Sequence, residues 1–134
     1  RTFGSIWNST VLSKIVLKKT WIHKMRKDVL GAWGESMAAR YYRNRGYRLL
    51  DKRYRTRFGE IDLIAEKKGM LVFIEVKTRS SNQIAQRRII LTAQNFLQKY
   101  DFSDFLVRFD VVEVIPDAQG RAQISCFENA FSVE

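Results

Sequence analysis

Two carboxylates and a lysine, Asp62, Glu75 and Lys77, stand within the most apolar part of this 134-residue chain. Asp62 lies in a strand-like run over residues 61–65, and Glu75 and Lys77 end a second run over residues 71–77. A Lys-Lys-Gly turn separates the two runs and predicts a β-hairpin. The charged groups occupy positions where an ordinary strand carries Val or Ile, so their placement needs a chemical reason.

The expected register of this hairpin brings the two acids together. A four-residue loop over residues 67–70 pairs Glu66 with Leu71. Continuing the antiparallel register from that pair places Asp62 opposite Glu75, with side chains about 5 Å apart. A slip of one residue would undo the arrangement, because it would move one acid to the other face.

Two carboxylates at this distance repel each other unless a cation lies between them. Lys77, on the same face as Glu75, supplies one positive charge. A hard divalent ion supplies two and prefers oxygen ligands, so Mg²⁺ or Mn²⁺ suits the site better than zinc, with the Val76 carbonyl as a further ligand. Such an ion activates water and a phosphate, and Lys77 can orient that water, which predicts phosphodiester hydrolysis. The simpler alternative is a Glu–Lys pair on a strand beside an unrelated acid.

Composition favours a polyanionic partner. The chain has 24 Lys and Arg against 14 Asp and Glu, a net charge of +10, and such a surplus marks nucleic acid more often than an anionic membrane. The single Cys126 excludes an internal disulfide and a multi-thiolate zinc site, and it predicts a reducing, cytoplasmic location. The single His23 argues against histidine-based catalysis. No uncharged apolar run approaches the roughly 18 residues that span a bilayer.

The expected nucleic-acid contacts are arginines around the hairpin. Residues 40–57 hold eight Lys or Arg, one acid and several tyrosines, and basic residues among aromatic rings suit phosphate contacts and base stacking. A solvated surface has the same composition, so both interpretations stay open. The arginines predicted to bind nucleic acid are Arg40, Arg43, Arg48, Arg53, Arg55, Arg57, Arg79, Arg87 and Arg88.

The elements that must position these groups form an α/β pattern. We expect a helix over residues 28–44, a strand over 47–55, the central hairpin, a helix over 84–100, a strand over 105–115 and a short edge strand over 122–127. This order implies a mixed sheet flanked by helices within one domain, residues 28–134.

Residues 1–27 form a basic N-terminal extension with seven Lys or Arg and no acid. Apolar positions at loosely helical spacing predict an additional helix packed on the domain or on a neighbouring molecule. A targeting segment is the alternative, although the apolar core and cleavage site of a secretory signal are absent. A membrane- or protein-binding role for this extension is a separate functional hypothesis.

Glu35 is a further candidate acid. It shares one face of the first helix with Ala38, Ala39 and Tyr42, and therefore points toward whatever that helix packs against. The favourable interaction of a first-turn acid with the helix dipole explains the same residue without any function.

The chain combines several short motifs: Gly34-Glu35 with Ala38-Ala39, Gly46-Tyr47, Arg57-x-Gly-Glu-Ile-Asp-Leu-Ile64, Val72-Phe-Ile-Glu-Val-Lys-Thr-Arg79, Phe109-Asp-Val-Val112 and Asn129-Ala-Phe131. Together these motifs resemble the YraN-like family of bacterial proteins. The likeness covers about Leu30 to Phe131 and implies the PD-(D/E)XK, restriction-endonuclease-like superfamily, with archaeal Holliday junction resolvases among its nearer relatives. The implied fold is an αβββαβ core with a mixed sheet of four to five strands.

By position, the resemblance implies that Asp62 and Glu75 are the metal-binding acids and Lys77 the motif lysine. It also implies that Glu35 is the acid carried on the first helix and aimed at the metal. The activity implied is a Mg²⁺- or Mn²⁺-dependent DNA endonuclease, selective for branched DNA in repair or recombination. Single-stranded DNA is the alternative partner. Cutting a two-fold junction would need a homodimer. The alternative is a catalytically silent DNA-binding module on the same fold.

Overall fold

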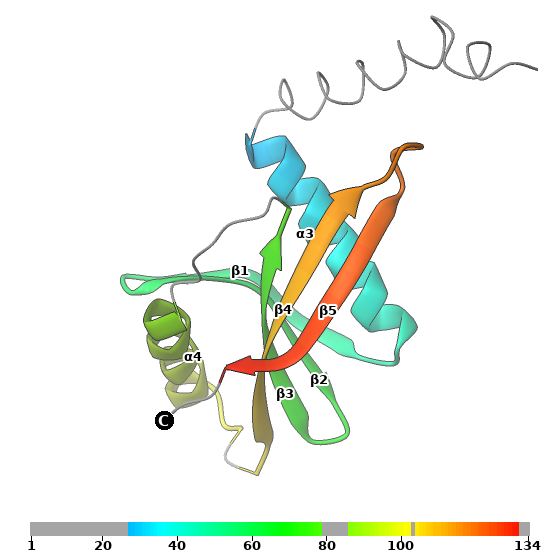
Figure 1. The fold of residues 1–134 in the computed structure, drawn as a ribbon. Helices are drawn as coiled ribbons and strands as arrows, with labels where there is room; N and C mark the ends of the chain where they lie inside the picture. The colour runs from blue at the N-terminus through cyan, green and yellow to red at the C-terminus, as the bar shows by residue number, and fades with distance from the viewer. Residues whose placement is uncertain (1–26, 79–85, 103, 132–134) are drawn as a thin grey trace, which may run out of the picture.

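The computed structural model describes residues 27–78, 86–102 and 104–131 (Figure 1). The expectations for residues 1–26 of the N-terminal extension lie outside this part of the chain. In order, the elements are α3 (Lys27–Asn44), β1 (Arg48–Thr56), β2 (Gly59–Lys67), β3 (Met70–Lys77), α4 (Gln86–Lys99), β4 (Leu106–Pro116) and β5 (Ala122–Phe131).

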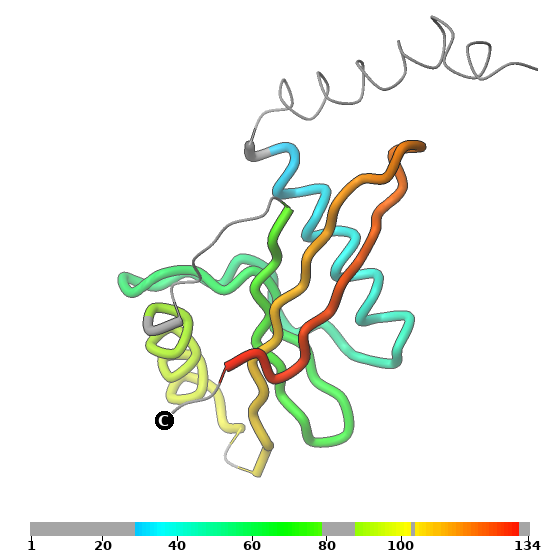
Figure 2. The backbone as a smooth tube through the Cα atoms, viewed as in Figure 1, coloured from blue at the N-terminus to red at the C-terminus, as the bar shows by residue number. Residues whose placement is uncertain are grey.

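The five strands form one mixed sheet in the order β1-β2-β3-β4-β5. Neighbouring strands are antiparallel except β3 and β4, which are parallel and are joined through α4. The backbone trace of Figure 2 shows β4 and β5 as a long hairpin beside β3. The predicted fold class is confirmed: a five-stranded mixed sheet flanked by two helices, consistent with a restriction-endonuclease-like core.

Each face of the sheet has its own apolar core. Strand β3 serves both, because Leu71 and Phe73 belong to the cluster with α4, whereas Val72 and Ile74 belong to the cluster with α3. A strand covered on both faces carries a continuous apolar run, as residues 71–74 do. The helices fill these cores with residues at helical spacing: Ala38, Ala39 and Tyr42 from α3, and Ile89, Ala93 and Phe96 from α4.

The β2–β3 hairpin has the predicted register, with Glu66 paired to Leu71. Its turn is tighter than the expected four-residue loop, since Lys67 pairs with Met70. Lys68 and Gly69 make the connection with φ angles of 49° and 81°, the left-handed conformations that two-residue hairpin turns favour. The expected four-residue loop and the observed two-residue turn give the same register of β2 against β3.

A buried carboxylate on β4 attaches α3 to the sheet. Asp110 is fully buried and accepts hydrogen bonds from Tyr42 of α3 at 2.7 Å and from both Nε and a terminal nitrogen of Arg108 at 2.8 Å. The hydroxyl of Tyr47 accepts a further bond from Arg108 at 3.0 Å. A charge withdrawn from water requires this many partners. Burial, with the hydrogen bonds of its hydroxyl, raises the pKa of Tyr42 far above its ordinary value.

Strand β5 is longer than the predicted edge strand of residues 122–127. It continues to Phe131, which pairs with Phe109 and stacks on its ring at 4.9 Å between centroids. A register irregularity interrupts the ladder before that pair. There Asn129 has a φ of 52°, and its N–H donates to Asp110 at 3.0 Å. The local sequence did not predict this extension of β5, because the extension depends on the contact of Phe131 with Phe109, which is distant in the chain.

Helix α3 approaches the end of β3 very closely at Gly34. A Cβ atom built on Gly34 would lie 2.0 Å from Cγ2 of Thr78 and 3.6 Å from Cγ1 of Val76. Glycine is therefore required, and it determines how near the next residue, Glu35, comes to the end of β3.

Within the described residues, no helix is long and apolar enough to cross a membrane.

Replacement of Gly34 by Ala should destabilise the protein by about 1–3 kcal/mol, because the new methyl group overlaps Thr78. Gly31→Ala is the matched control on the same helix. Nothing lies within 4 Å of a Cβ at Gly31, so this change should stabilise by up to about 1 kcal/mol through helix propensity. Denaturant unfolding measures both. Thr78→Ser, which removes the overlapping methyl group, should restore most of the loss in Gly34→Ala. Equal effects of the two glycine substitutions would contradict the close contact.

Candidate metal centre

Three carboxylates meet beside the end of β3. Glu35 comes from α3, and Glu60 and Asp62 come from β2. Each offers one oxygen, and the three oxygens lie within 4.8 Å of one another. All three residues are half-buried. An all-oxygen set of acidic ligands is the kind that hard divalent cations prefer.

The backbone of β3 holds Asp62 in place. The N–H of Val76 donates to Oδ2 of Asp62 at 2.8 Å. The ladder between β2 and β3 ends at the pair of Leu63 and Ile74, so beyond it a side-chain oxygen satisfies an N–H that a longer strand would have bonded. Glu75 lies beside Asp62, close enough for its carboxyl group to raise the pKa of Asp62.

Two acids of this cluster, Asp62 and Glu35, resist ionisation. Burial, together with the neighbouring carboxyl group of Glu75, raises the pKa of Asp62 to about 8, although the Val76 N–H opposes the rise. Burial also raises the pKa of Glu35; the hydrogen bond from Arg53 opposes this, and the charge of Asp62 adds to it. Without a cation, Asp62 therefore retains its proton near neutral pH.

Two arginines of β1 face the acids. Nε of Arg53 donates to Oε1 of Glu35 at 2.8 Å, and Nε of Arg55 donates to Glu60. Arg53 has a φ of 51° and lies between the paired residues Lys52 and Tyr54. This conformation is uncommon for a residue with a side chain, and it occurs where β1 passes the acids. The arginines leave the cluster partly neutralised.

The structure brings together Glu35 and Asp62 of the candidate acids and adds Glu60, whereas Glu75 lies beside Asp62 but outside this group of three. The sequence analysis missed Glu60, although it stands two residues before Asp62 in the same strand, a spacing that places both on one face. Lys77, the last residue of β3, stands two residues beyond Glu75 and is half-buried. Val76 contacts Asp62 through its N–H, and a ligand role for its carbonyl stays a prediction.

The predicted phosphate-binding arginines have different surroundings. Arg53 and Arg55 pair with acids, and the guanidinium carbon of Arg57 lies 4.8 Å from the ring centroid of Phe58. Arg79 and the side chain of Arg87 lie outside the part of the chain that the structure describes. The remaining four, Arg40, Arg43, Arg48 and Arg88, are exposed, and Arg48 lies 3.5 Å from Glu66.

The architecture is thus an α/β domain with an acidic cluster at the end of its central hairpin. Residues 34–114 match the profile of the uncharacterised protein family UPF0102, a range that includes every residue of the cluster. The chain belongs to this family, which confirms the YraN-like resemblance.

Similar UPF0102 proteins come from several bacteria. One from Caldanaerobacter subterraneus subsp. tengcongensis is 35% identical over 81% of this chain and 98% of its own length. One from Clostridium botulinum strain 657 is 39% identical over 84% of this chain and 100% of its own. One from Persephonella marina is 37% identical over 79% and 96%.

In EDTA, stability should fall as the pH rises from about 4 to 8. The folded state keeps the Asp62 proton up to a pKa of about 8, whereas the unfolded chain releases it near the ordinary Asp value of about 3.9. The unfolded state therefore binds fewer protons over this range. The free energy of unfolding should fall by at most about 1.4 kcal/mol per pH unit.

Urea unfolding at several pH values measures this slope. Asp62→Asn should flatten it, since the amide does not titrate and can still accept from Val76. Asp117→Asn is the contrasting variant. Hydrogen bonds from the Arg121 and Gln119 backbone lower the pKa of Asp117 to about 2, so its loss should leave the slope between pH 4 and 8 unchanged. A slope that persists in Asp62→Asn would exclude Asp62 as its source.

Proposed function

We propose that this protein is a divalent-metal-dependent DNA endonuclease. The observation that carries the proposal is the convergence of Glu35, Glu60 and Asp62 within 4.8 Å, with Glu75 in contact with Asp62. So many acids in one half-buried place repel each other, and a multivalent cation relieves that repulsion. The resemblance to PD-(D/E)XK nucleases supports the same role, because it selects three of these four acids independently.

Glu35, Glu60 and Asp62 would hold the ion, with Glu75 beside them, and their oxygens fit Mg²⁺ or Mn²⁺. Once bound, a divalent ion supplies Lewis-acid activation of a phosphodiester and of water. Binding must displace the proton that Asp62 otherwise retains. The affinity for the metal should therefore rise with pH up to about the Asp62 pKa of 8.

Lys77 is the residue best placed among the described lysines to assist the chemistry. It shares a strand face with Glu75, two residues away. An ammonium group there would orient the attacking water or stabilise the negative charge that grows on the phosphate oxygens. Arg53 and Arg55 would hold neighbouring phosphates once the metal replaces their charge beside Glu35 and Glu60.

The net charge of +10 supports a nucleic-acid substrate. The resemblance to resolvases favours DNA, and within DNA it favours branched molecules handled in repair or recombination in the cytoplasm. A DNA-binding module without catalysis is the rival function on the same fold.

Lys77→Ala should lower the rate of metal-dependent cleavage by about 100-fold or more while DNA binding survives, since the lysine stabilises charge in the transition state. Cleavage is measured on branched, linear and single-stranded DNAs with Mg²⁺, with Mn²⁺ and with EDTA, and binding in EDTA. Lys68→Ala, at the exposed turn of the same hairpin, is the control and should cleave normally. Parallel loss of binding and cleavage in Lys77→Ala would count against this role. Salt-dependent binding without any cleavage by the unaltered protein would select the rival function.

Glu60→Gln should weaken Mn²⁺ binding by about tenfold or more, because it removes a charged oxygen from the cluster. Isothermal titration calorimetry measures the affinity directly. Glu66→Gln is the matched control: Glu66 is a half-buried acid on the same strand, outside the cluster and beside Arg48. If both substitutions weaken Mn²⁺ binding equally, Glu60 is not a ligand.

A further inference from the structure

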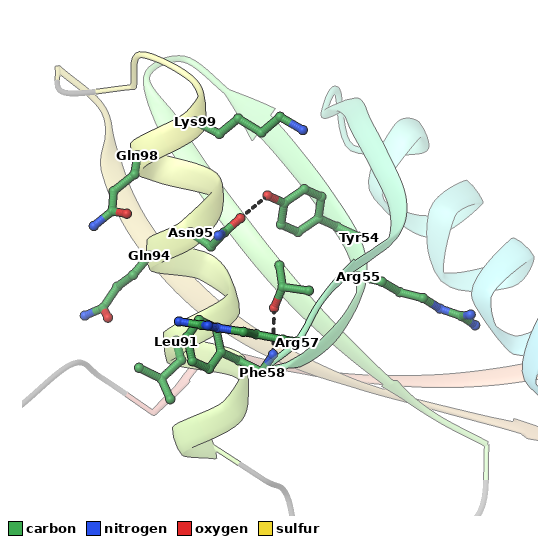
Figure 3. Close-up of a pocket in the computed structure, with 10 residues that line it drawn as sticks. Tyr54, Arg55, Arg57, Phe58, Leu91, Gln94, Asn95, Gln98 and Lys99 are labelled. Atoms are coloured by element: carbon green, nitrogen blue, oxygen red, sulfur yellow. Dashed lines mark hydrogen bonds between the residues drawn. The ribbon is translucent and has the colours of Figure 1, made fainter.

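A groove of about 650 Å³ lies between the end of the β1–β2 hairpin and α4 (Figure 3). Residues 54–58 of the hairpin form one wall. The other wall is one face of α4, whose lining residues follow helical spacing: Leu91, Gln94, Asn95, Gln98 and Lys99. None of the ten lining residues is acidic, and three carry amides. Three are basic, but one of these, Arg55, points its side chain away from α4 and pairs with Glu60.

The floor of this groove is fixed by contacts between the hairpin turn and α4. Thr92 donates its hydroxyl to the carbonyl of Arg88 at 2.7 Å, and the hydroxyls of Thr56 and Thr92 lie 3.4 Å apart. The N–H of Phe58 donates to Thr56 at 3.1 Å. A Cβ on Gly59 would lie 3.3 Å from Cβ of Arg88, so glycine permits this close packing. The groove is therefore preformed.

Its lining suits a nucleotide. The ring of Phe58 offers an aromatic face, and the guanidinium of Arg57 already lies over that ring. The hydroxyl of Tyr54 donates to Oδ1 of Asn95 at 2.5 Å, which fixes the orientation of that amide. Aromatic rings stack on bases, arginines bind phosphates, and amides pair with base edges. Lys99 adds a second cation at one end of the groove (Figure 3).

The hairpin separates this groove from the acidic cluster. Along β1, Arg53 and Arg55 contact the acids, whereas Tyr54 and Thr56 contact α4, as strand alternation requires. Figure 3 accordingly shows the side chain of Arg55 pointing away from α4. A nucleic acid that occupies both sites must bend sharply around the hairpin tip. A single strand can do so, but duplex DNA, with a persistence length of about 50 nm, cannot without a large energetic cost.

We propose that the groove binds unpaired nucleotides of a DNA strand whose neighbouring phosphodiester lies at the acidic cluster. The inference deepens the proposed nuclease function by naming its substrate class: DNA with a single-stranded segment next to the cut. A base takes the place of the Arg57 guanidinium over the Phe58 ring, and Arg57 and Lys99 bind the flanking phosphates. Binding at the groove itself needs no metal and no cleavage.

Fluorescence anisotropy in EDTA tests the groove separately from the chemistry. The probe is a labelled oligothymidylate of about 20 nucleotides, compared with a blunt duplex of similar length. The unaltered protein should bind the single strand more tightly. Arg57→Ala and Phe58→Leu should each weaken that binding about tenfold, through loss of a phosphate contact and of a stacking surface. Phe58→Leu keeps an apolar side chain, and thermal unfolding verifies that it folds.

Arg121→Gln is the matched control. Arg121 is an exposed arginine on the β4–β5 hairpin, where it pairs with Asp117, so its loss removes the same charge away from the groove. Single-strand binding should change less than about twofold.

The proposal is overturned if the groove variants bind the single strand as tightly as Arg121→Gln does. It is also overturned if duplex DNA binds as tightly as the single strand and is weakened equally by the groove substitutions. Metal-dependent cleavage that survives in the groove variants, with unchanged preference for unpaired DNA, would overturn the groove and leave the nuclease proposal intact. Groove-dependent binding of the single strand without any cleavage would support the groove and overturn the nuclease proposal.

Discussion

Mutual repulsion among carboxylates at the end of the central hairpin is the constraint on which the other features of the site depend. Glu35, Glu60 and Asp62 converge there, and Asp62 touches Glu75. Two features reduce the electrostatic repulsion among these acids when no metal is bound. One is the proton that Asp62 retains, and the other is the pair of arginines from β1. Both are replaceable by a cation of higher charge. The fold thus keeps the acids together at some cost to its own stability, as expected where ligand binding compensates for the loss.

Two contacts made by α3 determine where Glu35 lies. At one point the absence of a side chain at Gly34 lets the helix touch Thr78. About two turns later, Tyr42 donates to the buried Asp110 of β4. The first contact sets the distance between the helix and the end of β3, and the second prevents the helix from sliding along the sheet. The proposed role of Glu35 as a metal ligand needs such fixed points, because small displacements weaken a metal site.

The sequence predicted the parts of the structure that depend on local pattern. Alternation and turn chemistry determined the β2–β3 register, which leaves Asp62 and Glu75 side by side just beyond its last pair, Leu63 and Ile74, and not as a ladder pair. Glu35 needed the family resemblance, because a helical acid has the same local signature whether or not it faces a ligand. Glu60 was missed although its spacing to Asp62 was visible, since a salt-bridged surface acid and a ligand look alike in one dimension. The groove was beyond prediction because its walls are about 35 residues apart in the chain and meet only after packing.

The outer edge of the sheet carries a further consequence. Strand β5 is ten residues long, and an edge of that length offers unpaired backbone groups to any other extended chain. The irregularity at Asn129, whose N–H turns to Asp110, breaks the flat stretch of this edge. Such kinks hinder edge-to-edge pairing between molecules. The same buried Asp110 that fastens α3 thus also holds the kink in β5 that makes this edge a poor template for another strand.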